Sequence, residues 1–326
     1  MTKIIPLAEV TDAVRGGVIS IGNFDGVHRG HAALIGKARE MADRVAGPVV
    51  GVVLDPHPAA ILRPDRVPPK LTWIERRAEL LSQINTDFLV VVPTNQAFLN
   101  LSAADFFESL VKKTLAAKGI VEGPNFFFGR GREGNIETLQ TLCDQSEIDL
   151  VVADSSIDSD AMISSTRIRQ QLEAGNIEAA VHMLGHPHQI RGRVVRGDGR
   201  GTGIGFPTAN LSEIDVLVPA AGVYGGYAIH DGHRYRAAIH IGPNPTFNDR
   251  SDRKVEVHVM DYTGDLYDQM LLVDFVSRVR DIARFDSVEA LVAQLQLDIA
   301  SVQSSLGQSS LGKIETAKSE NNTNFK

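Results

Sequence analysis

Two histidines, His28 and His31, stand close to Gly22, Gly26 and Gly30 in the stretch 19–38, which reads Ile-Ser-Ile-Gly-Asn-Phe-Asp-Gly-Val-His-Arg-Gly-His-Ala-Ala-Leu-Ile-Gly-Lys-Ala. Its apolar residues first form a short run and then recur at helical spacing, which predicts a strand, a glycine-bearing loop and a helix. Glycines let a backbone approach a bulky anion, and a helix N-terminus presents free N–H groups with about half a positive charge. Imidazoles three residues apart lie on one helix face and can donate to the same phosphate group. The stretch therefore predicts a phosphate-binding site.

The same two histidines could also form a zinc pair, or be ordinary surface residues. A zinc site is disfavoured because the spacing is not His-Glu-x-x-His and Cys143 is the only cysteine of the chain.

The composition narrows the class of protein. The chain has 326 residues, 43% hydrophobic and 22% charged, which suits a soluble protein with two cores. A net charge of −7 disfavours nucleic acid as the main partner. The apolar runs are too short to span a bilayer, the N-terminus lacks a signal-peptide pattern, and one cysteine suits a reducing compartment. We expect a cytoplasmic protein with small-molecule partners, no nucleic-acid partner and no membrane partner; the oligomeric state cannot be predicted.

The first half of the chain alternates strand and helix patterns. Strands are predicted at 18–21, 49–54, 88–92, 119–122 and 150–152, and helices near 31–45, 73–84, 102–116, 135–146 and 169–184. This alternation is typical of an α/β domain with a doubly wound parallel sheet. Ligands bind at the carboxyl ends of the strands in such sheets, where the glycines and histidines lie.

After residue 188 the pattern becomes all-β. Hairpins are predicted across the turns 231–233 and 263–265, and the short, regularly spaced strands predict a small closed antiparallel β-barrel. A last helix is predicted from Asp286, with a capping-box pattern, and a disordered polar tail from residue 304. The predicted domains are 1–185 and 186–303, followed by the tail 304–326.

Two further stretches could bind phosphate. Residues 164–169 read Ser-Ser-Thr-Arg-Ile-Arg, which can cap a helix or hold a triphosphate. Residues 197–210 read Gly-Asp-Gly-Arg-Gly-Thr-Gly-Ile-Gly-Phe-Pro-Thr-Ala-Asn and fit neither a Walker A loop nor a dinucleotide fingerprint. Spacing alone favours a mobile loop for the second stretch.

These strings together resemble a known family. His-x-Gly-His is similar to the nucleotidyltransferase motif, and alone it would also fit cytidylyltransferases or pantetheine-phosphate adenylyltransferase. The longer string Gly-Asn-Phe-Asp-Gly-Val-His-x-Gly-His, with Ser-Ser-Thr-x-Ile-Arg and Gly-Phe-Pro-Thr-Ala-Asn, resembles the bacterial bifunctional riboflavin kinase/FAD synthetases. The resemblance covers about residues 16–300.

The resemblance implies that residues 1–185 form an FMN adenylyltransferase (FAD synthetase) domain. His28, His31 and Arg169 would stabilise charge on the reacting phosphates. Nucleotide and flavin would contact Gly22, Asn23, Phe24, Asp25, Gly26, Gly30, Asp55, His57, Asn125, Phe126, Phe128, Arg132, Ser164, Ser165, Thr166 and Arg167.

The resemblance also implies that residues 186–303 form a riboflavin kinase domain. Thr208 and Asn210 would bind Mg²⁺, to which neutral oxygens are suited when ATP supplies the charge, and Glu256 would be the general base. The pattern alone is equally consistent with Glu256 as one exposed residue of an alternating strand. Substrates would contact Gly199, Gly201, Gly203, Gly205, Phe206, Pro207, Tyr224, Asn244 and Arg280.

The implied function is phosphorylation of riboflavin by MgATP to FMN, followed by adenylylation of FMN by ATP to FAD with release of pyrophosphate. Two residues depart from the family pattern: His240 stands where asparagine is common, and Asp268 where glycine is usual. They motivate one alternative, a monofunctional FMN adenylyltransferase with a degenerate barrel. A non-catalytic flavin- or nucleotide-binding module is the other.

Overall fold

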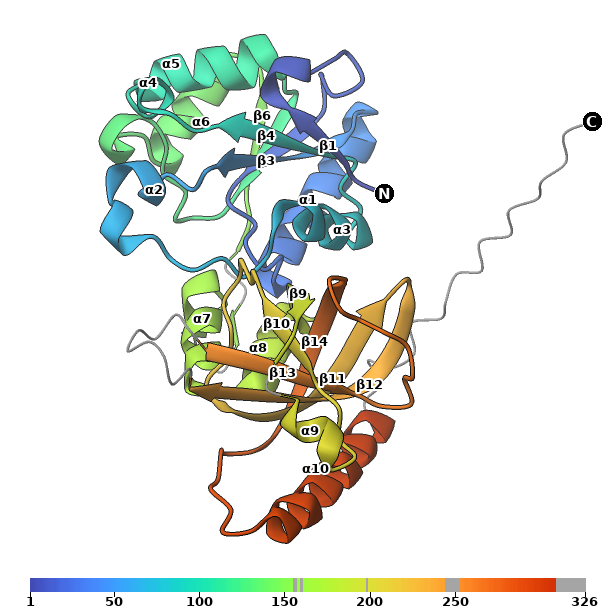
Figure 1. The fold of residues 1–326 in the computed structure, drawn as a ribbon. Helices are drawn as coiled ribbons and strands as arrows, with labels where there is room; N and C mark the ends of the chain where they lie inside the picture. Colours follow the sequence, from blue (N-terminus) through green and yellow to red (C-terminus); the bar gives the residue numbers. More distant parts are fainter. Residues whose placement is uncertain (155–156, 159–160, 198, 244–252, 309–326) are drawn as a thin grey trace, which may run out of the picture. The chain divides into compact units, whose positions relative to one another are not determined.

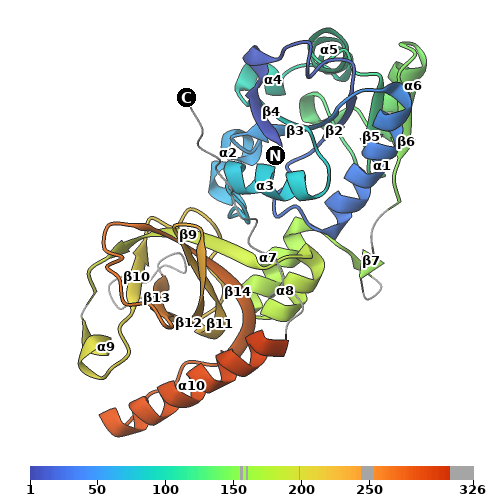
Figure 2. The same cartoon turned by 90° about the vertical axis from the view of Figure 1, so that its right-hand side faces the viewer.

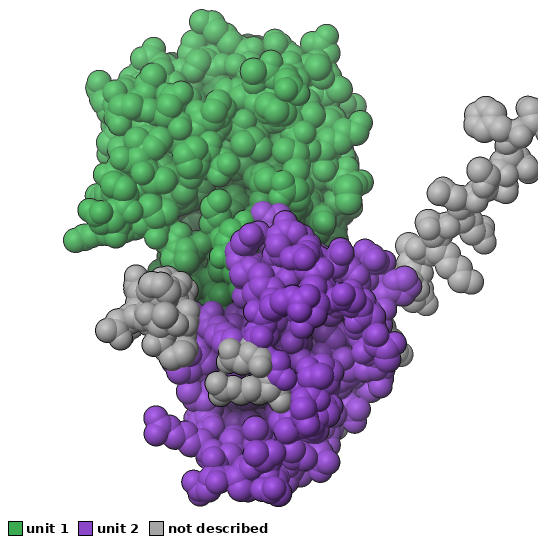
Figure 3. All heavy atoms as spheres, viewed as in Figure 1, with its two compact units in different colours: residues 1–190, 214–218 green, residues 191–213, 219–326 purple. Residues whose placement is uncertain are grey.

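The computed structural model describes residues 1–154, 157–158, 161–197, 199–243 and 253–308. The chain divides into two compact units, which Figure 3 colours separately. Unit 1 comprises residues 1–190 and 214–218, and unit 2 comprises residues 191–213 and 219–326. The short segment 214–218 therefore belongs to unit 1 although it follows the first strands of unit 2.

Unit 1 contains a six-stranded parallel sheet in the order β1-β4-β3-β2-β5-β6 (Figure 1). The strands are β1 (Lys3–Pro6), β2 (Val18–Ile21), β3 (Val49–Asp55), β4 (Phe88–Pro93), β5 (Gly119–Glu122) and β6 (Asp149–Val152). A small hairpin follows, formed by β7 (Ile157–Asp158) and β8 (Ala161–Met162). The strand that follows β2 in the chain, β3, lies on one side of β2, and β5 lies on the other side. The order of the strands therefore reverses at β2, and ligands bind at such a switch point in this architecture.

The two faces of this sheet are covered by different helices. Val49 and Val53 of β3 pack with α1 and α3 in one core, whereas Val50 and Val52 pack with α5, η3 and α6 in another. The helices are α1 (Arg29–Val45), α2 (Ala59–Leu62), α3 (Ile74–Gln83), α4 (Gln96–Leu99), α5 (Ala103–Phe106), α6 (Ile136–Asp144), α7 (Ser165–Ala174) and α8 (Ile177–Leu184), with the short turns η1 (Leu7–Glu9), η2 (Pro64–Arg66) and η4 (Arg130–Arg132) and the π-helix η3 (Phe107–Thr114). The predicted doubly wound sheet is confirmed.

Three predicted elements of unit 1 differ from the structure. The edge strand β1 is not predicted, and the helix at 102–116 divides into α5 and the π-helical η3. The single helix at 169–184 is wrong, because Gly175 adopts a left-handed conformation with φ 80° and ends α7 before α8 begins.

Unit 2 is a closed six-stranded barrel in the order β10-β13-β12-β11-β14-β9, and Figures 1 and 2 both show α10 beside it. The strands are β9 (His188–Val195), β10 (Ala209–Ser212), β11 (Gly222–His230), β12 (His233–Pro243), β13 (Arg253–Val259) and β14 (Met270–Arg280), with helices α9 (Arg200–Gly203) and α10 (Val288–Gln308). Val302 and Leu306 of α10 pack on Met260 and Val276 of the barrel. The predicted small barrel is confirmed.

The structure corrects two details of this half. The β11–β12 hairpin forms as expected, but β13 and β14 are not paired, because β13 lies between β10 and β12 while β14 pairs with β11. The helix α10 continues to Gln308, so residues 304–308 are helical rather than part of a tail. Ser287 Oγ accepts a hydrogen bond from the Ala290 N–H, which agrees with the predicted cap.

Candidate functional site

The two motif histidines of unit 1 form a reciprocal cap at the start of α1. His28 is the N-cap residue; its Nδ1 accepts from the His31 N–H at 3.3 Å, and His31 Nδ1 accepts from the His28 N–H at 3.2 Å. The rings are stacked with centroids 3.7 Å apart. Because each Nδ1 accepts a backbone hydrogen bond, the proton of each neutral ring is on Nε2. The pair therefore offers two N–H donors on rigid rings at a helix N-terminus.

Burial keeps these rings neutral. It lowers the pKa of His28 from 6.5 to about 4. Burial also lowers the pKa of His31 well below 6.5, with further lowering by His28 and Arg77. Near pH 7 both rings act as neutral donors, and the incoming phosphates would bring the negative charge.

The loop before the histidines is held by the carboxylate of Asp25. Asp25 accepts hydrogen bonds from the Leu71 and Thr72 N–H groups, Thr72 Oγ1, Arg77 and Arg169, and its own carbonyl accepts from Ser165 Oγ. It is 6% exposed. This carboxylate thus joins three segments: the glycine loop, the start of α3 and the start of α7. The Asp25 carboxylate is thus held by protein donors, and Arg169 is itself held by Asp25 and the Pro69 carbonyl.

Replacing Asp25 by alanine should destabilise unit 1 by about 3–5 kcal/mol, because it leaves a buried guanidinium of Arg77 without its charge partner. Trp73, the only tryptophan, is buried in unit 1, so its fluorescence reports the unfolding of that unit. The control is Asp43→Ala, which removes an exposed ion pair to Arg39 and should cost about 1 kcal/mol or less. Equal unfolding midpoints for the two variants would contradict this role of Asp25.

The capped start of α7 lies near the glycine loop. Ser164 Oγ accepts from the Arg167 N–H, and the carbonyl of Ile163 lies 3.7 Å from where a Cβ on Gly30 would be. Thr166 is exposed on the first turn. Gly26 has φ 84°, and a Cβ there would lie 2.9 Å from Leu71, so only glycine fits this turn. The two predicted phosphate stretches of unit 1 therefore come together.

The remaining predicted contacts of unit 1 separate into exposed and buried residues. Phe24 and Phe128 are 1% and 5% exposed and belong to the two hydrophobic cores of the sheet. Phe126 stacks on Phe128, whereas Asn125 is exposed after β5. Gly22, Asn23, Asp55 and His57 lie at or just after the carboxyl ends of β2 and β3, whereas Arg132 belongs to η4.

Two buried histidines give unit 1 a pH-dependent stability. Burial lowers the pKa of both His28 and His188 from 6.5 to about 4. Between these values the unfolded chain binds more protons, so the stability falls as the pH falls through that window. Glu122 acts in the opposite direction, since burial raises its pKa well above 4.5.

The histidine contribution can be isolated by substituting His188, whose Nε2 donates to the Leu217 carbonyl. A His188→Gln variant keeps an N–H donor but does not titrate. Wild type should lose about 2 kcal/mol more stability than the variant between pH 7 and pH 5, measured by denaturant unfolding. Identical losses in the two proteins would show that burial of His188 does not depress its pKa.

Unit 2 contains a cavity of about 350 Å³ that brings together most of the predicted kinase residues. Its lining includes Gly199, Gly201, Phe206, Thr208, Asn210, Glu256 and Arg280. Leu291 and Leu295 of α10 supply an apolar wall. Arg280 makes a bidentate ion pair with the buried Asp298 of α10, with N–O distances of 2.9 and 2.7 Å. The cavity therefore combines a glycine-rich loop, a carboxylate and an apolar wall, as a site for an amphipathic ligand and phosphates requires.

Three side chains follow one row across neighbouring strands. Asn210 of β10 is paired with Glu256 of β13, and Glu256 is paired with His240 of β12. Glu256 Oε2 lies 3.2 Å from His240 Nδ1, and Oε1 lies 2.8 Å from Lys254 Nζ. The hydrogen bond from His240, aided by the one from Lys254, lowers the pKa of Glu256 from 4.5 to about 2. Glu256 is therefore ionised near pH 7.

Asn210 has the chemistry and the burial expected of a neutral cation ligand. It is 8% exposed, and among the described residues its buried Oδ1 has no hydrogen-bond partner. A Cβ on Gly197 would lie 2.2 Å from Asn210 Nδ2, so the glycine leaves room for this amide. A buried amide oxygen without a partner, near the exposed Thr208 hydroxyl, fits the neutral-oxygen ligands that Mg²⁺ accepts alongside nucleotide phosphates.

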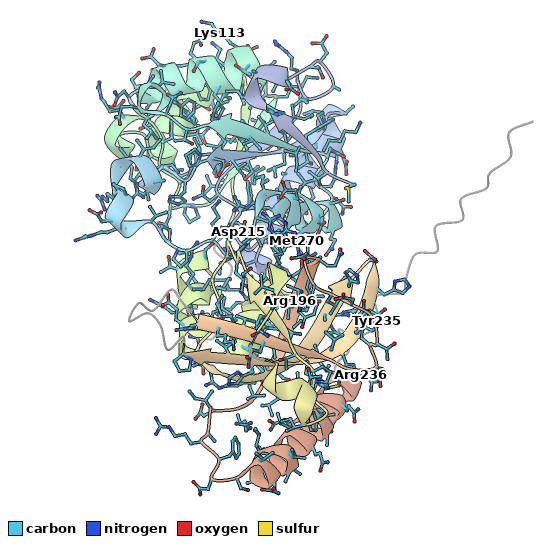
Figure 4. All side chains as sticks on the ribbon, in the orientation of Figure 1. Lys113, Arg196, Asp215, Tyr235, Arg236 and Met270 are labelled. Atoms are coloured by element: carbon cyan, nitrogen blue, oxygen red, sulfur yellow. The ribbon has the colours of Figure 1, made fainter. Side chains whose placement is uncertain are left out.

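Several predicted residues of unit 2 lie elsewhere. Tyr224 is 0% exposed, and its hydroxyl donates to the Ala220 carbonyl and accepts from Arg278, so it is buried in the core of the barrel. Gly203, Gly205 and Pro207 do not line the cavity, although Pro207 lines a smaller one of about 170 Å³ with Thr208 and Tyr267. Asn244 lies outside the described residues. Arg196, which Figure 4 labels, precedes the glycine-rich loop. Its guanidinium carbon lies 4.9 Å from the centroid of the Tyr267 ring.

Sequence reasoning missed Lys254, Phe127 and the role of His240. Lys254 and Glu256 share one face of a strand by the period of two, a signal that could have linked them. Phe127 is the exposed phenylalanine of its run, at 44%, with Arg132 over its ring at 4.3 Å. No pattern along the chain distinguishes it from its two neighbours.

Two family models match the chain. An FAD synthetase model matches residues 11–167, and a riboflavin kinase model matches residues 184–306. The bifunctional riboflavin kinase/FMN adenylyltransferase of Escherichia coli (strain K12) is 35% identical over 87% of this chain and 90% of its own length. The chain belongs to the bifunctional riboflavin kinase/FMN adenylyltransferase family. The family resemblance inferred from the sequence strings is thus confirmed.

Other members of the bifunctional riboflavin kinase/FMN adenylyltransferase family are similar to this chain over most of its length. The protein of Pseudomonas fluorescens is 34% identical over 89% of this chain and 93% of its own length. The protein of Bacillus subtilis (strain 168) is 32% identical over 86% and 90%. A crystal structure titled as a macrolide-efflux protein from Streptococcus pneumoniae matches with a TM-score of 0.84 and 31% identity, covering 92% of this chain and 98% of that one. In the part of this chain that the structure describes, the helices are too short or too polar to cross a membrane.

The two departures from the family pattern have structural explanations. Asp268 adopts the left-handed conformation with φ 62°, which glycine adopts freely and aspartate tolerates. His240, which replaces the common asparagine, forms a hydrogen bond with Glu256. Neither residue disrupts the barrel, and together with both family matches this favours the bifunctional assignment over a degenerate barrel or a non-catalytic module.

Proposed function

We propose that this chain carries out both reactions of its family on separate sites, riboflavin phosphorylation in unit 2 and FMN adenylylation in unit 1. The observation that supports this assignment is that Asn210 and Glu256 are paired across two strands and line one cavity with the glycine-rich loop in unit 2. The histidine cap belongs to unit 1. The substrates are riboflavin, FMN and ATP, and the cytoplasm, where these compounds occur together, is the proposed location.

In unit 2, Glu256 accepts the proton of the terminal ribityl hydroxyl as that oxygen attacks the γ-phosphorus of ATP. Its ionised state suits this role. Each carboxylate oxygen has two lone pairs, so each can accept the hydroxyl proton while it also accepts a hydrogen bond from His240 or Lys254. Thr208 and Asn210 would hold Mg²⁺, which when bound neutralises phosphate charge. Gly199 and Gly201 line the same cavity, and their N–H groups would donate hydrogen bonds to phosphate oxygens.

In unit 1, the FMN phosphate attacks the α-phosphorus of a second ATP and pyrophosphate leaves. The attacking phosphate is already ionised, so no base is required. His28 and His31 donate Nε2–H hydrogen bonds to the charge that develops, and the start of α7 holds the leaving pyrophosphate. Asp25 positions both segments through its hydrogen bonds to Leu71, Ser165 and Arg169.

Labelled ATP distinguishes the two reactions in one protein preparation. With riboflavin and Mg²⁺, a label on the γ-phosphate should enter FMN first and then remain in FAD. With unlabelled FMN supplied, a label on the α-phosphate should enter FAD, and the γ-label should enter only pyrophosphate. Absence of the γ-label from FMN would refute the kinase assignment, and absence of the α-label from FAD would refute the adenylyltransferase assignment.

A further inference from the structure

His240 makes a contact that the reaction scheme above does not use. It faces Glu256 across the β12–β13 pair, and both side chains line the same cavity. The His240 side chain is 45% exposed and that of Glu256 is 25% exposed, so the pair lies at the cavity surface, where a substrate can reach it.

The direction of the hydrogen bond follows from the charge of its partner. An ionised carboxylate can only accept, so His240 Nδ1 carries a proton and donates it to Glu256 Oε2 at 3.2 Å. Lys254 Nζ donates to the other oxygen at 2.8 Å. Each oxygen of the Glu256 carboxylate thus accepts a hydrogen bond from a different donor. Rotation about the terminal torsion of glutamate is otherwise nearly free, so these contacts fix the carboxylate plane.

The backbone is shaped to accommodate the imidazole. Gly242 follows His240 by two residues on the same face of β12, and a Cβ there would lie 2.9 Å from His240 Cε1. Any larger residue at this position would displace the ring. The space left by Gly242 therefore holds the His240 ring beside Glu256.

From these contacts we propose that His240 is a positioning residue for riboflavin phosphorylation, which orients the Glu256 carboxylate toward the ribityl hydroxyl. The inference rests on the proposed role of Glu256 as the proton acceptor. In asparagine, Nδ2 is bonded to Cγ as Nδ1 is in histidine, so an asparagine at position 240 can offer a donor at nearly the same place. Phenylalanine keeps the ring but removes the donor.

The test compares His240→Phe and His240→Asn in the full chain, with riboflavin, ATP and Mg²⁺. His240→Phe should lower kcat for FMN formation on the order of 10–100-fold with little change in KM for riboflavin, because a misplaced catalytic group costs rate rather than binding. His240→Asn should restore most of kcat. Conversion of supplied FMN to FAD by the same preparations should equal wild type, as should all rates of His233→Ala, which removes an exposed histidine of the same barrel.

A second variant tests the contact between His240 and Glu256 by filling the space that Gly242 leaves for the His240 ring. Gly242→Ala should lower kcat in the presence of His240 and have a smaller effect in the His240→Asn background, where there is no ring to displace. The inference is overturned if His240→Phe retains the wild-type kcat, or if His240→Asn is as slow as His240→Phe. A parallel Glu256→Gln variant distinguishes failure of the role proposed for His240 from failure of the role proposed for Glu256. If it is inactive while His240→Phe is fully active, only the role of His240 fails; if it turns over riboflavin normally, the role of Glu256 fails as well.

Discussion

Replacing Glu256 by glutamine is expected to lower FMN formation from riboflavin on the order of 10²–10⁴-fold. The amide keeps the size of the side chain and an oxygen that His240 can donate to, but it cannot accept the hydroxyl proton. Conversion of supplied FMN to FAD should remain at the wild-type rate, because the histidine cap belongs to unit 1. Both rates are obtained by chromatography of the flavins after incubation with MgATP.

A matched control for this variant is Glu213→Gln, which removes an exposed glutamate of unit 2 that pairs with Arg193. It should leave both rates unchanged, since exposed ion pairs contribute about 1 kcal/mol or less to stability. Normal FMN formation by Glu256→Gln would exclude Glu256 as the proton acceptor.

Replacing His31 by alanine is expected to lower FAD formation from FMN on the order of 10²–10³-fold, the usual cost of losing one preorganised donor to developing charge. FMN formation from riboflavin should persist, so FMN should accumulate. The substitution also removes the acceptor for the His28 N–H, which costs about 1 kcal/mol as loss of a helix cap does.

A His31→Gln variant separates the cap from the chemistry. Glutamine at this position of a capping box can accept from the His28 N–H, but it has no rigid Nε2–H donor stacked on His28. We expect its thermal stability to approach that of wild type and its FAD formation to remain low. His182→Ala, which removes an exposed histidine of α8, should behave as wild type. Full activity of His31→Gln would assign His31 to the cap alone.

The sequence predicts what depends on local pattern. The strands β2 and β5 have the predicted bounds, because buried parallel strands are rich in apolar, β-branched residues, here Val18 and Ile19 in β2 and Ile120 and Val121 in β5. The start of α1 beside His28 and His31 was also predicted, because the change from an apolar run to helical spacing is visible in the chain, whereas the reciprocal histidine cap was not. Likewise, the β11–β12 hairpin follows from the two-residue Asp-Gly turn.

What the sequence does not reveal depends on contacts between distant residues. The apparent turn at 263–265 suggested a hairpin, but strand pairing is decided by closure of the whole barrel, which places β13 beside β10. Phe24, Phe128 and Tyr224 are all buried, and no pattern along the chain predicts how far each aromatic side chain is buried. The Asp25 carboxylate accepts hydrogen bonds from donors that are 46 to 144 residues away along the chain, and only the fold brings them together.

The central claim is that two independent sites on one chain are connected by FMN as the product of one and the substrate of the other. The most direct test mixes purified Glu256→Gln and His31→Ala with riboflavin, ATP and Mg²⁺ and follows FAD by chromatography. Each variant alone should make little or no FAD from riboflavin, and the mixture should make it, because FMN formed by one is adenylylated by the other. A mixture that makes FMN but no FAD, from variants that each keep their remaining activity, would contradict the claim.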